Sequence, residues 1–344
     1  MANFTLDDVR QRTYKARDAW WTVLLVDPLA ARLVKVTANR TRITPNQLTV
    51  AALVLGLAAA ACFAMADWQW LLAGALLYHL SFTLDCMDGK IARLKGTGSV
   101  FGAWLDYIFD RLRVLACAIA LMAGQYAATG NVAYVWTALA VVFLDMLRYM
   151  DSLEIFKVRT QMRTTLAKAR REAESLELAE LRTGNGAGDE VGARLASAEH
   201  DLEAGGEDDE DRVVGEDAAA EKAADAVMQG GLYTRFPWYA GIRDVLMRGR
   251  IRPHLFSGIE FQMGVFIVAP IAAAIVSGAI IPVVAVSAAG MLFFELVVIY
   301  KFWMATNAYN RNMRVLDEKI AGFRERLPVE EAERIRAGAG TSAG

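Results

Sequence analysis

The stretch Leu84–Arg111 reads LDCMDGKIARLKGTGSVFGAWLDYIFDR and sets two pairs of carboxylates into an apolar part of the chain. Its skeleton is Asp85-x2-Asp88-Gly89-x2-Ala92-Arg93-x8-Gly102-x3-Asp106-x3-Asp110. Asp85 and Asp88 are three residues apart, and Asp106 and Asp110 are four apart, so on helices each pair shares one face. The spacing therefore predicts two neighbouring helices that each present two carboxylates.

Carboxylates within membrane helices are costly and usually mark function. Four of them brought together repel one another unless cations lie between them. Hard divalent ions with oxygen ligands, Mg²⁺ above all or Mn²⁺, are the natural partners beside a phosphate. The pattern predicts one or two such ions holding a phosphorylated substrate, and we expect two. The alternative is that the aspartates pair with neighbouring basic residues at the membrane surface, namely Lys90, Arg93, Arg111 and Arg113.

The residues between the aspartates also suit a phosphate site. Gly89, Ala92 and Gly102 keep side-chain bulk off the same helix faces and allow close approach of a helix or ligand. Arg93 can bind a phosphate through two hydrogen bonds. The connection Lys95–Ser99 (KGTGS) adds backbone donors and hydroxyls at the start of the next helix, where anions are favoured.

The rest of the chain predicts an all-α integral membrane protein. Of its 344 residues, 55% are hydrophobic and 22% charged, and the mean hydropathy is +0.27, which is too apolar for an ordinary soluble enzyme. A nucleic-acid binder would need a basic patch on a soluble module, and the sequence has none. Backbone groups in lipid must be satisfied internally, so each apolar run is expected to be a helix. Six runs are long enough: Gln47–Ala66, Trp68–Leu84, Val100–Ala123, Val132–Met150, Phe261–Ser277 and Ile280–Trp303.

The basic residues predict the orientation of these six helices. The connections 66–68, 124–132 and 277–281 carry no Lys or Arg. The opposite ends carry Arg40, Arg42, Lys90, Arg93, Lys95, Lys157, Arg159, Arg163, Lys301, Arg311 and Arg314. Because positive residues stay on the cytoplasmic side, both termini and the aspartates are expected there, in a multi-pass protein of the inner or plasma membrane. The N-terminal residues lack the apolar core of a signal peptide.

The predicted division of the chain has six parts. They are an N-terminal cytoplasmic and interfacial segment (1–46), helices one to four with the motif (47–156), an acidic, partly disordered cytoplasmic insertion (157–232), a basic interfacial segment (233–260), helices five and six (261–303), and a cytoplasmic tail (304–344). Trp20–Val36 is predicted to be an amphipathic helix lying in the headgroup plane, or else the leading end of the first membrane helix. Within the insertion, Glu172–Glu180 fits a short charged helix or coiled-coil piece, and the insertion as a whole fits a solvated linker better than a regulatory element.

The skeleton resembles the signature of the CDP-alcohol phosphatidyltransferase family at every defined position, including the eight-residue gap. The resemblance extends to Ile43–Thr49 (ITPNQLT) and to the six-helix layout. It implies a membrane enzyme, expected to be a homodimer, that transfers a phosphatidyl-type group from a CDP-linked donor to an alcohol and releases CMP. It implies Asp85, Asp88, Asp106 and Asp110 as metal ligands, with Asp110 as the catalytic base. The residues expected to bind the CDP moiety are Asp85, Gly89, Ala92, Arg93, Thr97 and Gly102.

Three functions remain open on the sequence. The first uses CDP-diacylglycerol as donor and a small polar alcohol or alcohol phosphate as acceptor. The second reverses the partners, with a soluble CDP-alcohol and a lipid acceptor. The third is a non-catalytic membrane scaffold. Arg148, Lys157 and Arg159 are candidate acceptor-binding residues. Inositol phosphate, glycerol phosphate and serine are all candidate acceptors, but Met146–Arg159 does not repeat the basic pattern of the inositol-phosphate branch, which makes that acceptor less favoured.

Overall fold

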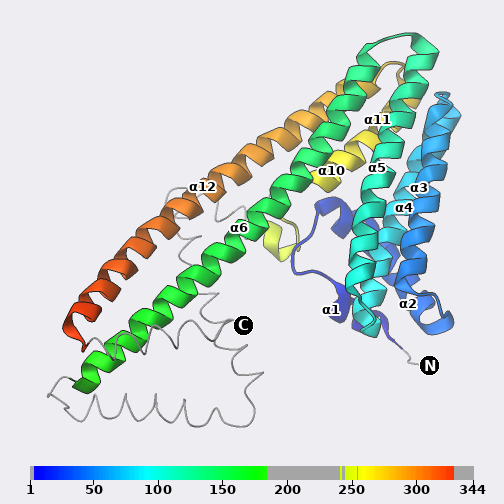
Figure 1. The fold of residues 1–344 in the computed structure, drawn as a ribbon. Helices are drawn as coiled ribbons and strands as arrows, with labels where there is room; N and C mark the ends of the chain where they lie inside the picture. Colours follow the sequence, from blue (N-terminus) through cyan, green and yellow to red (C-terminus); the bar gives the residue numbers. More distant parts are fainter. Residues whose placement is uncertain (1–3, 184–240, 242–244, 254, 329–344) are drawn as a thin grey trace. The chain divides into compact units, whose positions relative to one another are not determined.

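The computed structural model describes residues 4–183, 241, 245–253 and 255–328. These residues form helices and no strand, apart from an isolated bridge between Asp18 and Ile251 (Figure 1). Six helical regions are long and apolar enough to cross a membrane, so the all-α membrane class is confirmed. The elements are α1 (Leu6–Thr13), η1 (Thr22–Val26), α2 (Asp27–Arg40), α3 (Pro45–Ala64), α4 (Trp68–Lys95), α5 (Val100–Thr129), α6 (Ala133–Thr183), α10 (Gly258–Met263), η2 (Gly264–Val268), α11 (Ala269–Ile275) and α12 (Ile280–Arg326).

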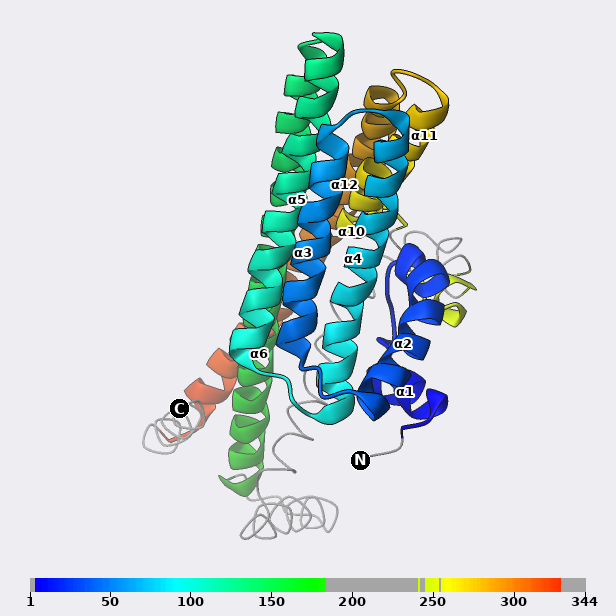
Figure 2. The ribbon, with the colours of Figure 1, turned by 90° about the vertical axis from the view of Figure 1, so that its right-hand side faces the viewer.

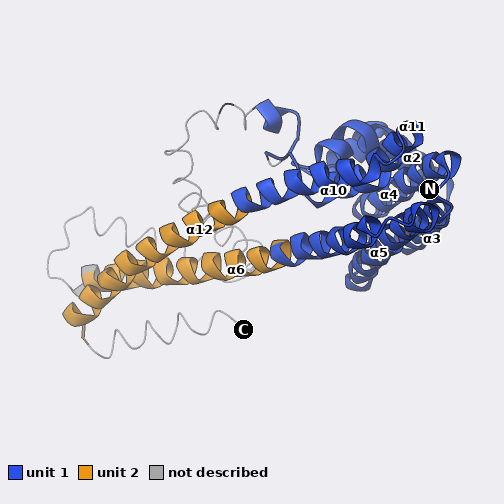
Figure 3. Cartoon of the chain, turned by 90° about the horizontal axis from the view of Figure 1, so that it is seen from above, with its two compact units in different colours: residues 1–151, 240–297 blue, residues 152–239, 298–344 orange. Residues whose placement is uncertain are grey.

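The chain divides into two compact units (Figure 3). Unit 1 comprises Met1–Asp151 and Ala240–Val297. Unit 2 comprises Ser152–Tyr239 and Val298–Gly344. All the residues of the aspartate motif lie in unit 1.

In unit 1, α3 lies between α4 and α5 and packs against both, and α11 and η2 pack against α4 (Figure 2). Helix α3 begins where the sequence favours a helix start: Thr44 caps it together with Gln47, and Pro45 occupies its first position. The apolar core of the bundle includes Phe63, Tyr78, Leu121 and Phe266. A β-carbon on Gly124 would lie 2.7 Å from the carbonyl oxygen of Ala64, so this glycine allows α5 to approach α3 closely.

The helices follow the predicted apolar runs at their starts but extend beyond most of them. Helix α4 continues past Leu84 to Lys95 and therefore carries the first half of the motif. Helix α6 continues past Met150 to Thr183, and α12 past Trp303 to Arg326. Hydropathy detects the part of a helix that suits lipid, whereas hydrogen bonding continues into the polar residues that follow.

Helices α1 and α2 of the N-terminal segment pack against the motif end of α4 (Figure 2). Helix α2 ends at Arg40 and is separated from α3, so Trp20–Val36 is not the leading end of the first membrane helix. Its position in the headgroup plane stays a prediction. The buried carboxylate of Asp27 pairs with Lys90 of α4 at 3.0 Å and with Arg250 at 3.2 Å, which joins three distant parts of the chain.

In unit 2, the later part of α6 packs against the later part of α12. The apolar contacts join Ala169, Ala173, Leu176 and Ala179 to Ile320 and Leu327. Glu172 pairs with Arg324, and Glu180 pairs with Arg326 at 2.9 Å. Residues Glu172–Glu180 are therefore helical and paired with a second helix, as the coiled-coil interpretation expected. The rest of the predicted insertion and most of the segment 233–260 lie outside the described residues.

Candidate active site

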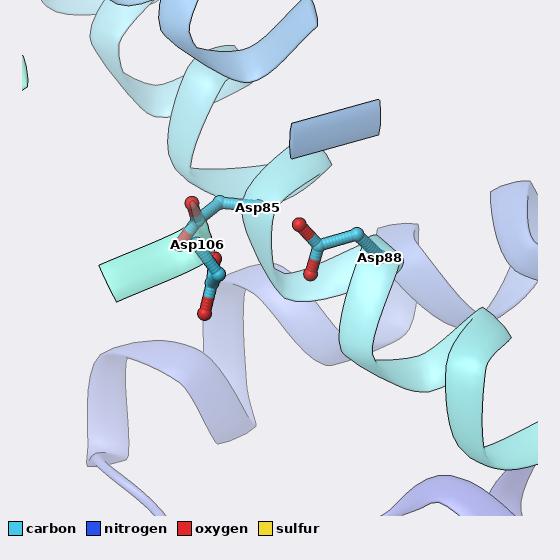
Figure 4. A group of neighbouring side chains, drawn as sticks. All are labelled: Asp85, Asp88 and Asp106. Atoms are coloured by element: carbon cyan, nitrogen blue, oxygen red, sulfur yellow. The ribbon is translucent and has the colours of Figure 1, made fainter. Parts of the chain in front are cut away.

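Three of the four motif aspartates converge at one point between α4 and α5. Asp85 and Asp88 extend from α4 and Asp106 from α5, and one carboxylate oxygen from each lies within 4.8 Å of the others (Figure 4). Asp88 is buried, and Asp85 and Asp106 are partly buried. The two halves of the motif thus form one acidic cluster, which we call the carboxylate trio (Asp85, Asp88 and Asp106).

Helix α3 supports the trio through residues of the ITPNQLT stretch. The hydroxyl of Thr49 donates a hydrogen bond to Asp88 Oδ2 at 2.5 Å. A β-carbon on Gly102 would lie 2.8 Å from Asn46 Oδ1, so the glycine of the motif leaves room for the Asn46 side chain. The two sequence stretches that carry the family resemblance therefore contact each other in the fold.

Arg113, two turns beyond Asp106 on α5, is buried beside the trio with 1% of its side chain exposed. Its guanidinium lies 3.2 Å from Asp85 Oδ1 and also pairs with Asp110. It donates a further hydrogen bond to Ser81 Oγ at 3.3 Å. A buried arginine needs such partners, because an unpaired charge in a low-dielectric interior is strongly destabilising.

Asp110 lies outside the trio and is held by two arginines. One of its oxygens pairs with Arg111 and the other with Arg113. The alternative of pairing with basic neighbours therefore describes Asp110 and, in part, Asp85. It does not describe Lys90, which pairs with Asp27. The metal-ligand and base roles of Asp110 stay predictions.

The remaining residues expected at the CDP moiety lie around the end of α4 and the start of α5. Arg93 is exposed, and its Nε donates to the carbonyl oxygen of Thr13 at 3.2 Å. A β-carbon on Gly89 would lie 3.5 Å from the Arg93 guanidinium, so Gly89 borders that side chain. Ala92 is partly buried on the same helix, and Thr97 is exposed in the connection to α5. Their contact with a CDP group stays a prediction.

The candidate acceptor residues have protein partners of their own. Arg148 of unit 1 pairs with Glu295 at 3.1 Å, and both side chains are largely buried. Lys157 pairs with Glu154 one turn earlier on α6, in an exposed pair at 3.5 Å. Arg159 lies on α6, and both it and Lys157 belong to unit 2. Arg148 is thus tied to the membrane helices, whereas Lys157 lies on a solvated helix face.

A chain of polar contacts that no sequence pattern predicted reaches Asp110 through Arg111. Asp145 of α6 pairs with Arg111 and accepts a hydrogen bond from Gln262 Nε2 of α10 at 2.9 Å. Gln262 Oε1 accepts in turn from the hydroxyl of Tyr78 at 3.3 Å. The signal was present: Asp145 stands within the apolar run VVFLDML, where a charge is costly.

The donor chemistry of the trio fits a divalent ion. Three carboxylates with oxygens within 4.8 Å of one another offer hard ligands to one centre, as Mg²⁺ or Mn²⁺ require. The partly buried setting lowers screening by water and strengthens binding of a small cation. Asp85, Asp88 and Asp106 could hold such an ion.

Fold and site together define a multi-pass helical membrane protein with a carboxylate cluster suited to divalent ions. Residues 42–170 match the model of the CDP-alcohol phosphatidyltransferase family. The matched residues contain the whole motif and the whole ITPNQLT stretch (Ile43–Thr49). The family resemblance predicted from the motif is confirmed.

Curated relatives match the chain over shorter stretches. It is 34% identical over 89 residues to the phosphatidylinositol phosphate synthase of Corynebacterium glutamicum, covering 26% of this chain and 37% of the relative. It is 43% identical over 70 residues to the archaetidylinositol phosphate synthase of Pyrococcus horikoshii, covering 20% and 36%. It is 29% identical over 99 residues to the archaetidylinositol phosphate synthase of Methanothermobacter thermautotrophicus, covering 29% and 49%. The matches thus span less than half of each relative.

Proposed function

We propose that the protein transfers a phosphatidyl group from CDP-diacylglycerol to the hydroxyl of a small polar alcohol or alcohol phosphate, and releases CMP. The observation that carries this proposal is the carboxylate trio on the family motif, at the ends of two membrane helices. A site at that depth lets the diphosphate of a CDP-lipid reach the carboxylates while its acyl chains remain in lipid.

Two divalent ions, Mg²⁺ or Mn²⁺, are proposed as cofactors; bound at these aspartates, they would supply positive charge that stabilises the diphosphate and the departing CMP. Asp85, Asp88 and Asp106 would hold them, with Asp110 as the fourth proposed ligand, and Arg93 with the backbone of the Gly96–Ser99 connection would bind phosphate oxygens. Gly89, Ala92, Thr97 and Gly102 border the CDP moiety. These residues would hold the phosphorus in position for attack.

Asp110 is proposed as the base that takes the proton of the acceptor hydroxyl, a step worth roughly 10²–10⁴-fold in rate. Arg111 and Arg113 hold both of its oxygens, so one oxygen must exchange its arginine for the acceptor hydroxyl before the proton moves. Two arginines stabilise the carboxylate in one orientation until the acceptor arrives.

The acceptor class follows from the relatives. They are named as synthases of phosphatidylinositol phosphate and archaetidylinositol phosphate, which makes inositol phosphate the first acceptor to test, even though residues 146–159 do not favour it. Glycerol phosphate and serine are the next two. Arg148, Lys157 and Arg159 are the proposed acceptor contacts. The reversed reaction, a soluble CDP-alcohol with a lipid acceptor, is the alternative; a scaffold is disfavoured because the relatives are synthases.

The proposal places the site and both termini in the cytoplasm, which the distribution of Lys and Arg supports. It also places α2 at the membrane interface. A homodimer is proposed from the family resemblance. Cysteine labelling of the two termini in intact cells tests the orientation. Crosslinking in native membranes tests the homodimer.

The decisive experiment is CMP release by the purified protein with Mg²⁺, CDP-diacylglycerol and a panel of acceptors, with product masses measured. Asp110→Asn should abolish turnover and leave metal-dependent CDP binding largely intact. If the wild-type protein releases no CMP with any acceptor, and none from soluble CDP-alcohols with diacylglycerol, the enzymatic proposal is wrong.

A further inference from the structure

Asp145 is a buried carboxylate, 3% exposed, on a helix that carries no residue of the motif. Its Oδ2 pairs with Arg111, and its Oδ1 accepts from Gln262. Both oxygens are therefore engaged, one by a charge and one by an amide. An ionised carboxylate in a membrane helix costs free energy and usually marks a functional site, so its partners indicate its role.

The partner Arg111 is shared. One end of its guanidinium pairs with Asp145 and the other with Asp110, and the group lies over the ring of Tyr149 at 4.6 Å. Asp110 and Asp145 thus compete for one cation. Without Asp145, the guanidinium would be free to bind both oxygens of Asp110, since bidentate pairing is the favoured geometry of arginine with a carboxylate.

Gln262 holds Asp145 at the end of this series of polar contacts that lies farthest from Asp110. It is 4% exposed, and its position on α10 is set by the helix start, where Ser257 and Glu260 form a reciprocal cap. Its amide nitrogen donates to Asp145 and its oxygen accepts from Tyr78 of α4, which fixes the orientation of the amide. The chain Tyr78–Gln262–Asp145–Arg111–Asp110 therefore joins α4, α10, α6 and α5 within unit 1.

We propose that Asp145 is a positioning residue: by sharing Arg111 with Asp110, it weakens the hold of Arg111 on the Asp110 oxygen that must be released to the reacting groups. The proposal rests on the proposed function, because it assigns a purpose to the orientation of Asp110. It concerns a residue on α6, outside the sequence motif, that acts through Arg111 and not by touching substrate. Groups that orient the ligands of a metal site in this way typically change affinity or activity by roughly 10–100-fold when removed.

The test compares Asp145→Asn, Arg111→Gln and the double variant in the full-length protein. Asp145→Asn keeps the shape but removes the charge, so it should lower kcat by roughly 10–100-fold and leave KM for the CDP-lipid nearly unchanged. In the Arg111→Gln variant, Asp145→Asn should lower kcat almost no further, because the guanidinium that Asp110 and Asp145 share is already absent. A merely structural role predicts losses that multiply.

Mn²⁺ binding measured by electron paramagnetic resonance, without substrate, gives a second readout. Asp145→Asn should weaken binding modestly, since Arg111 then holds Asp110, the proposed fourth metal ligand, more tightly, and it should not weaken binding further in Arg111→Gln. Thr137→Val is the matched control: it removes a polar group from α6 whose hydroxyl bonds within its own helix, to Ala133 O at 2.8 Å, and it should behave as wild type.

The outcomes separate the two proposals. If Asp145→Asn keeps wild-type kcat and Mn²⁺ affinity while Asp110→Asn is inactive, the positioning role is wrong and the enzymatic function stands. If the wild type releases no CMP with any substrate, the function is wrong, and the Mn²⁺ cycle alone decides the positioning role. Should Asp145→Asn fail to fold, Gln262→Met replaces it, with a smaller loss expected in the same direction.

Discussion

Gly56 of α3 makes room for the stem of Arg113 of α5: a β-carbon on Gly56 would lie 2.6 Å from Arg113 Cγ and 2.7 Å from its Cδ. The arginine that pairs with Asp85 and Asp110 can therefore be buried because its neighbour has no side chain. The close approach of these two residues connects helix packing to the charges at the site.

Replacing this glycine should disturb both stability and chemistry. Gly56→Ala overpacks the contact and is expected to cost about 1–3 kcal/mol of stability, together with a loss of CMP release because Arg113 must move. Thermal unfolding in detergent and the CMP assay measure the two effects. Gly322→Ala is the control, since nothing lies within 4 Å of its β-position on α12. Equal melting temperatures for the two variants would contradict the packing argument.

The hydrogen bond from Thr49 to Asp88 predicts a role for α3 in metal binding. Thr49→Val removes the donor and should weaken Mn²⁺ binding roughly 10-fold or more, because Asp88 is then free to turn away from the trio. Thr49→Ser retains the hydroxyl and should bind nearly as well as wild type. Calorimetric titration of the purified protein measures both. Wild-type affinity in Thr49→Val would show that Asp88 needs no support from α3.

The ion pair between Arg148 and Glu295 is expected to stabilise unit 1. Because Arg148 is 16% and Glu295 8% exposed, Arg148→Gln or Glu295→Gln should cost about 1–3 kcal/mol, less than for a fully buried pair. The double variant should recover part of the loss, since neither charge is then left alone. Lys157→Gln, in an exposed pair, should stay within about 0.5 kcal/mol of wild type.

Arg148 is also a proposed acceptor contact, and the same variants separate the two roles. An acceptor contact predicts that Arg148→Gln raises KM for the acceptor even when Glu295→Gln is present. Strictly additive stability losses in the double variant would mean that the pair does not couple the two helices.

Unit 2 should unfold locally when its apolar contact is weakened. Leu176, 1% exposed, packs against α12, and Leu176→Ala should cost about 2–5 kcal/mol within that unit. Hydrogen exchange should rise in residues 152–183 and 298–326 and stay unchanged in α3 and α4. Leu153→Ala, at a half-exposed position, is the control. Uniform exchange throughout the chain would contradict two separate units.

The carboxylate trio could be predicted from the sequence because its geometry depends on residues that are close together in the chain. Spacings of three and four residues determine which face of a helix a carboxylate occupies, and the short connection between α4 and α5 brings the two helices together. The convergence of Asp85, Asp88 and Asp106 follows from these two facts. The apolar runs likewise located the starts of the membrane helices.

Pairing of the aspartates with Arg111 and Arg113 was an alternative that the sequence left open, but the hydrogen-bond contacts through Asp145 could not be predicted in the same way. They depend on how α5, α6 and α10 pack, and single-sequence spacing does not encode contacts between residues 117 positions apart, such as Asp145 and Gln262. The length of α12 was underestimated because the membrane run ends at Trp303 while the helix continues into charged residues. Asp110 was grouped with the other aspartates on its spacing and on the family resemblance, and the structure shows that Arg111 and Arg113 of the same helix pair with it.

Because the connection between α4 and α5, Gly96–Ser99, is short, the aspartates meet only if each keeps its present number of residues from that connection. Deleting one residue between Ser99 and Asp106 would rotate the Asp106 side chain by about 100° around the α5 axis, since an α-helix has 3.6 residues per turn. The third oxygen donor would then point elsewhere, however sound the rest of the bundle. Natural variants of this protein should therefore tolerate changes of length far more readily in their solvent-exposed segments than along these few turns.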